Sequence, residues 1–461
     1  MRDFVDQYWE KEALPALMEF GTIPNVSVAF AKDWKADGHM EHAVNYLAGW
    51  AKGQAIPGMT VEIQKIEGRT PLIFIEVPAT DGSDETVLMY GHYDKQPPME
   101  GWREGLGPWT PVREGNLLYG RGLADDGYAI FAALGGVLAT HNAGLKYPRV
   151  VVMIEGSEES GSPDLEPYID SLKSRIGTAK TVITLDVEGR DTKHLWLTQS
   201  LRGLVNCYLT IEALGRNMHS GLAVGVVPSV TRILRILLDR VEDSKTGDIK
   251  STVLNPPATA SACTNCDTIA ESQGQRFLDD FHLPAHLKPM EENIAALIQR
   301  NLWQAGLEVT GITGLPPVDI AGNVTAGKLV VKLSFRIPPG VDGHAAFNEL
   351  KKILEADPPY GAKVTLTPET NDSGWSAKEY SPEGKARIWK AAQEVYDSEP
   401  IITGDGASIP FVHMFVSRYP ESEHVLIGVL SHDSNAHGPN ENLSVPIVKK
   451  VTEFLGRLLA R

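Results

Sequence analysis

Val87-Leu88-Met89-Tyr90-Gly91-His92-Tyr93-Asp94 is an apolar run that ends in a histidine and an aspartate. A continuous apolar run of this length is typical of a β-strand that is buried on both faces. Similar runs precede the pair Glu158-Glu159 and Asp186, and His437 lies in the loop after another. Open α/β sheets carry their sites at the carboxyl ends of such strands. The sequence therefore predicts an α/β fold that gathers these side chains at one edge of a sheet.

The residue types at this predicted edge are those of a two-metal hydrolytic site. Two imidazoles and several carboxylates are suitable ligands for divalent cations. Asp125 and Asp126 join the group, although an aspartate ahead of an apolar helical stripe could serve only as a helix cap. So many like charges at one edge would be costly unless cations neutralised them.

The composition is that of an acidic globular protein. A chain of 461 residues is too long for one ordinary core, so two domains are expected. The net charge of −16, without a basic run, argues against nucleic acid and anionic membranes as partners. We expect neither a secretory signal at the start nor an apolar run that spans a bilayer. The expected location is the cytoplasm.

The pattern of strands and helices changes near residue 195. Beyond it, the residues of 328–337 alternate between apolar and polar, which predicts a strand with one polar face. Residues 252–326 are expected to be irregular. The order of elements suggests a small inserted α+β domain of residues 196–371. The expected catalytic domain is then discontinuous and consists of residues 1–195 and 372–461. The other expected elements are strands at 59–66, 72–77, 204–214 and 362–366, and helices at 228–241, 345–354 and 445–459.

Several sequence motifs resemble those of the M20 metallopeptidases. The resemblance is strongest to the branch that includes the carnosinases and Cys-Gly dipeptidases. The motifs occur in that family's order and spacing along nearly the whole chain. The resemblance implies a mixed-sheet catalytic domain with helices on both faces and a ferredoxin-like lid or dimerisation domain. The motifs are Gly91-His92-Tyr93-Asp94, Gly120-Arg121-Gly122 with Asp125-Asp126-Gly127, Glu155-Gly156-Ser157-Glu158-Glu159-Ser160-Gly161-Ser162, and Ala436-His437-Gly438-Pro439-Asn440-Glu441.

The resemblance also implies a set of metal ligands. Two divalent ions would be bound, with Zn²⁺ as the expected metal and Mn²⁺ or Co²⁺ as alternatives, because these suit carboxylate-rich sites with one imidazole each. The peptide bond between Asp125 and Asp126 is implied to be cis. The implied ligands are His92, Asp125 and Asp186 for one metal, and Asp125, Glu159 and His437 for the other, so that Asp125 bridges the two.

Catalytic roles follow from the same resemblance. Glu158 would be the general base that takes a proton from a water bridging the metals and passes it to the leaving amine. Asp94 would orient His92. His219 would reach across a dimer and stabilise the oxyanion in the partner's site.

Two further residues, Arg336 and Ser408, match the family's binding site for the substrate carboxylate. Ala407 replaces a glycine of the family's Gly-Gly-Ser-Ile-Pro loop. Other assignments stay open. Glu188 could assist a metal ligand or point to solvent. His432 and Asp433 compete with His437 for the assignment as metal ligand, and the motif around His437 favours His437.

The sequence thus predicts a metal-dependent hydrolase that cleaves the amide bond of dipeptides or similar short peptides. The alternative is an N-acyl-amino-acid amidohydrolase of the same fold. A nucleotide-binding oxidoreductase has only Gly120-Arg121-Gly122 in its favour, without the third glycine. A binding protein without catalysis would not need Glu158. The expected partners are a small peptide or N-acyl amino acid as substrate and a second copy of the chain in a homodimer.

Overall fold

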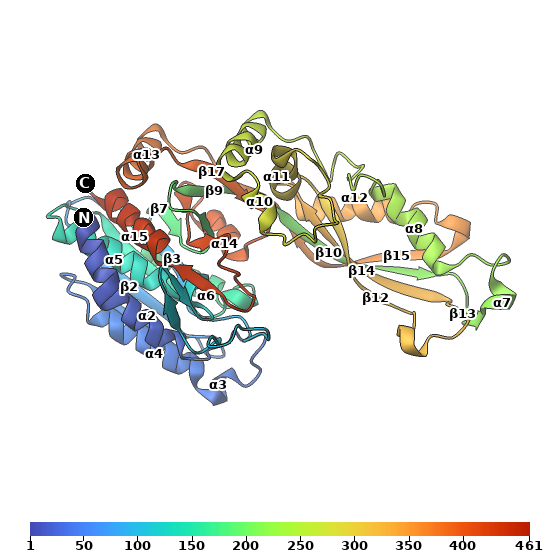
Figure 1. The fold of residues 1–461 in the computed structure, drawn as a ribbon, viewed down its shortest axis with the longest axis horizontal. Helices are drawn as coiled ribbons and strands as arrows, with labels where there is room; N and C mark the ends of the chain where they lie inside the picture. The colour runs from blue at the N-terminus through green and yellow to red at the C-terminus, as the bar shows by residue number, and fades with distance from the viewer. The chain divides into compact units, whose positions relative to one another are not determined.

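The computed structural model describes all 461 residues, which divide into two compact units (Figure 1). Unit 1 consists of Met1–Gln199, Lys378–Ile402 and Ile409–Arg461, and unit 2 of Ser200–Ala377 and Thr403–Ser408. The expected domains differ from these units in one respect that matters for the site. Residues 403–408 lie in unit 2, although the sequence pattern placed them in the catalytic domain.

The large sheet is mixed, as expected. Its four central strands β6, β3, β7 and β18 run parallel to one another, and antiparallel strands flank them. The parallel arrangement brings the carboxyl ends of the four central strands to one edge. The strand order is β1 (Thr60–Gln64), β2 (Leu72–Val77), β6 (Arg149–Glu155), β3 (Thr86–His92), β7 (Ala179–Thr184), β18 (Glu423–Leu426), β9 (Trp196–Leu201) and β16 (Trp375–Ser376), and β17 (Ile401–Asp405) also pairs with β9.

Helices cover both faces of the central strands, because alternate side chains of a strand point to opposite faces. Met89 of β3 belongs to the main core together with residues of α4 (His39–Lys52), α5 (Ala129–Asn142) and α15 (Val445–Leu459). The next residue, Tyr90, packs against Phe411 and Phe415 of α14 (Pro410–Arg418), with ring centroids 4.3 and 5.1 Å apart. The expectation of strands buried on both faces is therefore confirmed.

One stretch contradicts the expectation that no apolar run is long enough to span a membrane. Leu123–Asn142 is long and apolar enough to do so. The apolar part of this stretch is, however, completely buried inside the protein. Such burial is typical of the central helix of a globular core, and the length of the stretch alone is weak evidence for a membrane span.

Unit 2 is built around a four-stranded antiparallel sheet with the order β12-β14-β10-β15. The predicted alternation in β14 is confirmed, since Leu329, Val331, Leu333, Phe335 and Ile337 are all buried. They form a core with α8 and α12. In chain order the elements are β10 (Gly203–Glu212), α8 (Val230–Val241), β12 (Gly306–Thr313), β14 (Lys328–Ile337), α12 (Gly343–Glu355) and β15 (Lys363–Asp372).

Residues 252–326 are not irregular, and that prediction was wrong. They contain α9 (Ala260–Gln273), α10 (Arg276–Asp279), α11 (Ile294–Trp303) and β12. Helix α9 escaped notice because its buried face is short and includes alanine and glutamine, which gives little apolar periodicity. Strand β12 lies at the sheet edge and exposes Val309 and Ile312, so it lacks the alternation of a half-buried strand.

Smaller elements complete the two units. They are α1 (Arg2–Tyr8), α2 (Leu14–Gly21), α3 (Trp34–Asp37), β4 (Val112–Glu114), β5 (Leu117–Tyr119), α6 (Leu165–Ile176), β8 (Glu188–Arg190), β11 (Met218–His219), α7 (Ser220–Ala223), β13 (Val324–Thr325), α13 (Pro382–Tyr396), β19 (Leu430–Ser431) and β20 (Asn442–Ser444).

Candidate metal centre

The approach of α5 to the end of β3 brings Asp125 beside His92. A side chain at Gly91 would place its Cβ only 2.3 Å from Ala129 Cβ and 2.7 Å from Asp126 Oδ2, so only glycine permits this approach. Asp126 does not cap the helix. Its Oδ2 accepts a hydrogen bond from the backbone N–H of His92 at 3.1 Å, and the peptide bond between Asp125 and Asp126 is cis.

The first cluster of possible ligands lies at the ends of β3 and β7. His92 Nε2 is 3.3 Å from Asp125 Oδ1 and 3.7 Å from Asp186 Oδ2. The imidazole is buried, yet its Nε2 has no hydrogen-bond partner. A buried nitrogen between two carboxylates, without a hydrogen bond of its own, fits a metal ligand.

The second cluster shares Asp125 with the first. His437 Nε2 is 3.0 Å from Asp125 Oδ2 and 3.2 Å from Glu159 Oε2. The two carboxylate oxygens of Asp125 therefore face different imidazoles. Within each cluster of three residues, the ligand atoms lie within 4.8 Å of one another. The arrangement can hold two cations with one carboxylate between them.

The loop that carries His437 is anchored by a buried ion pair. Arg121 donates to Glu441 Oε2 at 2.6 Å and to the backbone oxygen of Gly438 at 2.7 Å. The N–H of Gly122 donates to Glu441 Oε1 at 2.9 Å. The Gly120-Arg121-Gly122 segment thus holds the His437 loop. Because the Gly122 amide is already bonded to a carboxylate, it is not free for a nucleotide phosphate.

Asp94 contacts both the first imidazole and the turn that follows β6. Its carboxylate oxygen lies 3.4 Å from His92 Nδ1, and its backbone oxygen lies 3.1 Å from the same nitrogen. The carboxylate also accepts the backbone N–H groups of Glu158 and Glu159 at 3.0 and 3.1 Å. Asp94 therefore fixes the turn as well as the ring, and the sequence pattern indicated only the second task.

Glu158 lies beside the first cluster without belonging to it. Its Oε2 is 3.9 Å from His92 Nε2, beyond hydrogen-bonding distance. Burial raises the pKa of Glu158 well above its usual range, and the neighbouring charges of Asp186 and Glu159 add to the effect. A buried carboxyl with a raised pKa beside a possible metal pair is suited to accept and release a proton.

The other titratable groups of the centre are also strongly perturbed. Hydrogen bonds to Asp125 and Glu159 raise the pKa of His437 to about 11. Burial raises the pKa of Asp186 and of Glu159. Burial alone would raise the pKa of Asp125 too, but the imidazoles of His437 and His92 beside it hold the pKa below its usual range. Such shifts are typical of functional sites.

These pKa directions predict that cation binding releases protons. At neutral pH, His437, with a pKa of about 11, and Asp186, with a pKa of about 8, hold protons that a cation must displace. The apparent affinity for Zn²⁺ or Mn²⁺ should therefore rise as the pH is raised from below the pKa of Asp186, about 8, toward that of His437, about 11. Titration calorimetry in buffers of different ionisation enthalpy measures the number released, and binding without net proton release would contradict the prediction.

Several predicted residues lie outside the two clusters. His219, Arg336 and Ser408 belong to unit 2, whereas the clusters belong to unit 1. Glu188 forms an ion pair with Arg190. His432 and Asp433 are not members of either cluster.

The sequence pattern missed two residues that contact this part of the molecule. Gln96 Nε2 donates to Glu159 Oε2 at 2.6 Å. Glu155 is buried at the end of β6, and burial raises its pKa to about 7. Glu155 belongs to one of the sequence motifs named above, and Gln96 lies two residues after another of these motifs. Nothing in the spacing of the two residues indicates what they contact.

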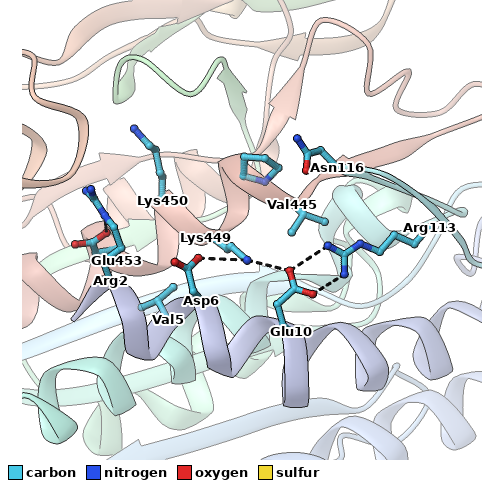
Figure 2. Close-up of a pocket in the computed structure, with 11 residues that line it drawn as sticks. Arg2, Val5, Asp6, Glu10, Arg113, Asn116, Val445, Lys449, Lys450 and Glu453 are labelled. Atoms are coloured by element: carbon cyan, nitrogen blue, oxygen red, sulfur yellow. Dashed lines mark hydrogen bonds and ion pairs between the residues drawn. The ribbon is translucent and has the colours of Figure 1, made fainter.

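A separate cavity of about 320 Å³ lies between α1 and α15 (Figure 2). All of its charged residues except Lys450 are paired with one another or with a neighbouring charge. Glu10 bonds Arg113 at 2.6 Å and Lys449 at 2.9 Å, and Lys449 also lies 3.2 Å from Asp6. Because these charges neutralise each other, we do not regard this cavity as a ligand site.

Comparisons with known proteins identify the family and the fold of this chain. Residues 88–461 match the model of peptidase family M20/M25/M40. The Cys-Gly metallodipeptidase of Candida albicans is 26% identical over 398 residues, which cover 83% of this chain and 80% of that protein. The human Beta-Ala-His dipeptidase is 24% identical over 388 residues, which cover 81% and 74%. The structure of the di-peptidase Dug1p from Saccharomyces cerevisiae has the same fold, with a TM-score of 0.74 at 22% identity over 99% of this chain and 97% of that one.

Proposed function

Because the chain belongs to peptidase family M20/M25/M40, we propose that this metallopeptidase cleaves the amide bond of dipeptides or similar short peptides at a dinuclear metal centre. The observation that carries the proposal is the position of Asp125, whose two oxygens lie 3.3 and 3.0 Å from the imidazole nitrogens of His92 and His437. The Cys-Gly and Beta-Ala-His dipeptidases, similar over most of this chain, support dipeptides as the substrate class.

Each metal would have one imidazole and two carboxylates as ligands. The unpaired Nε2 of His92 and the carboxylate-rich surroundings support this assignment. Zn²⁺ suits such a donor set, as do Mn²⁺ and Co²⁺. The first metal would be held by His92, Asp125 and Asp186, and the second by Asp125, Glu159 and His437.

The protein's own groups would then carry out proton transfer. When bound, the two cations supply the Lewis acid that activates a water molecule and polarises the scissile carbonyl. Glu158 would take the proton of the attacking water on a carboxylate oxygen and deliver it to the leaving amine nitrogen. Asp94 would keep the Glu158 turn and the His92 ring in place through the bonds described above.

The substrate carboxylate would be bound by Arg336 and Ser408. Arg336 is half-buried on β14, and its Nη1 is buried without a hydrogen-bond partner. Burial lowers the pKa of this guanidinium, so an anionic partner would be favourable. The Ser408 loop is held by Arg202, which donates to Gly406 O at 3.0 Å.

Unit 2 would serve as a lid and dimerisation domain of the ferredoxin-like type. Its order of β-α-β-β-α-β and its antiparallel sheet support this description. His219 is exposed next to apolar residues that are also exposed, among them Leu222, Val226 and its ladder partner Val324 at 73, 81 and 52%. An exposed apolar group of this kind marks an interaction surface. We propose that a second copy of the chain covers it and receives His219 into its site.

This assembly predicts rescue between two inactive variants. His219→Ala lacks the histidine that it offers to its partner, and Glu158→Gln lacks the base. A mixed dimer holds one complete site, so an equimolar mixture should regain about a quarter of wild-type activity after subunit exchange. Activity is measured with a dipeptide, and native mass spectrometry checks exchange. A mixture that stays inactive after exchange would refute the shared site, as would a fully active monomer.

Hydrolysis of a substrate panel tests the proposed function. Enzyme reconstituted with Zn²⁺, Mn²⁺ or Co²⁺ is given dipeptides, the corresponding dipeptide amides, longer peptides and N-acyl amino acids. We expect dipeptides to be cleaved with the highest kcat/KM, and Glu158→Gln to lower this activity by about 10²–10⁴-fold. Preference for N-acyl amino acids would identify the alternative amidohydrolase, and metal binding without hydrolysis would indicate a binding protein. The cytoplasmic location and the absence of nucleic-acid and membrane partners stay predictions.

A further inference from the structure

Glu155 is a buried carboxylate whose oxygens are bonded by three hydroxyl groups. Tyr90 Oη and Ser162 Oγ donate to Oε1 at 2.5 and 2.9 Å, and Ser157 Oγ donates to Oε2 at 3.0 Å. All four side chains are buried. Glu155 belongs to neither ligand cluster. Its position between β3 and the turn after β6 suggests a task in positioning.

Ser157 and Ser162 flank the turn that carries Glu158, and Tyr90 lies on the neighbouring strand β3. Ser157 precedes Glu158 directly, and Ser162 closes the turn with its backbone N–H on Ser157 O at 3.0 Å. Tyr90 is itself fixed, because its ring packs against Phe411 and Phe415 of α14. Glu155 therefore ties both ends of the turn to a rigid point on β3.

The carboxylate of Glu158 depends on this turn more than that of its neighbour does. Glu159 is also held by its side chain, through Gln96 at 2.6 Å and the contact with His437 at 3.2 Å. The nearest cationic group to the Glu158 carboxylate is His92 Nε2, at 3.9 Å. Its backbone therefore determines where the Glu158 carboxylate lies.

We infer that Glu155 is a positioning residue that holds the general base Glu158 against the metal centre. This inference rests on the proposed function, because it gives Glu155 a role only through the proton transfer assigned to Glu158. A reacting group that is displaced by about 1 Å can lose on the order of 100-fold in rate. The hydrogen bonds of the three hydroxyl groups to Glu155 would prevent such a displacement.

The first test is Glu155→Gln in the metal-reconstituted enzyme. Glutamine keeps the size of the side chain but replaces one acceptor oxygen by an amide donor. The three hydroxyl groups can then no longer all donate to this side chain as they do to Glu155. We expect kcat for a dipeptide to fall about 100-fold, with KM and metal content unchanged. The matched control is Glu453→Gln, the same change at a buried carboxylate of α15 that pairs with Arg2 and Arg457. It should leave kcat unchanged.

A double-mutant cycle separates positioning of the base from general stability. If Glu155 acts through Glu158, then Glu155→Gln should cause no further loss of kcat in a Glu158→Gln background. A purely structural role would reduce kcat by the same factor in both backgrounds, and that result would overturn the inference. Loss of metal together with kcat would overturn it too.

A milder variant decides the matter if Glu155→Gln does not fold. Ser157→Ala removes one hydroxyl donor and should lower kcat about 10-fold, again only when Glu158 is present. Wild-type kcat in Ser157→Ala would then reject the inference. A failure of the proposed function is distinguishable, since the unmodified enzyme would then hydrolyse no dipeptide of the panel.

Discussion

Glu158→Gln is expected to lower kcat for a dipeptide by about 10²–10⁴-fold while both metal ions stay bound. The substitution keeps the size of the side chain and removes the group that accepts the proton. The Glu158 carboxylate lies 3.9 Å from His92 Nε2 and belongs to neither ligand cluster, so the metals should keep their ligands. The measurements are steady-state kinetics and metal analysis of the same preparation, with Glu453→Gln as control.

Two results would contradict this assignment. If metal content falls in step with kcat, Glu158 is a ligand and not the base. If kcat is unchanged, another group transfers the proton.

Asp125→Ala is expected to weaken the binding of both metals, each by more than about 100-fold, and to abolish hydrolysis. Loss of a group that only supports a ligand already costs about 10–100-fold in metal affinity, so loss of a shared ligand should cost more. The comparison is His437→Ala, which removes a member of the second cluster alone and should mainly release one metal. Metal titration of the purified variants, followed by dipeptide hydrolysis, measures both effects.

The control for Asp125 is an aspartate outside the centre. Asp170 is exposed and pairs with Arg418 at 2.7 Å, so Asp170→Ala should bind two metals normally. Full occupancy of two metals in Asp125→Ala would reject the bridging role. Loss of one metal alone would show that Asp125 belongs to a single cluster.

The edge of the sheet was predictable from the sequence because the central strands are parallel and buried on both faces. Such strands leave continuous apolar runs, and their carboxyl ends meet at one edge. His92 and Asp186 follow two such runs directly. Their distance of 3.7 Å is therefore a consequence of strand order that a sequence pattern can indicate.

The choice between a helix cap and a ligand at Asp125 could not be decided in this way. Both readings need an aspartate ahead of an apolar helix. The difference lies in the approach of α5 to Gly91 and in the loop around His437, which comes from more than 300 residues later in the chain. Contacts between such distant segments leave no periodic signal.

Other features were missed because their burial is slight or their partners are remote. Helix α9 and strand β12 bury too little apolar surface to show a period. The bonds of Asp94 to the backbone of Glu158 and Glu159, and of Glu155 to the hydroxyl group of Tyr90, join the ends of the neighbouring strands β3 and β6. The sequence motifs contain these residues but do not indicate their hydrogen-bond partners.

The most direct test of the dinuclear centre is a crystal structure of the Mn²⁺-reconstituted enzyme with anomalous diffraction data. We expect two anomalous peaks per chain, one bound by His92 and Asp186, the other by Glu159 and His437, with Asp125 bound to both. A single peak, or two peaks that do not share Asp125, would contradict it.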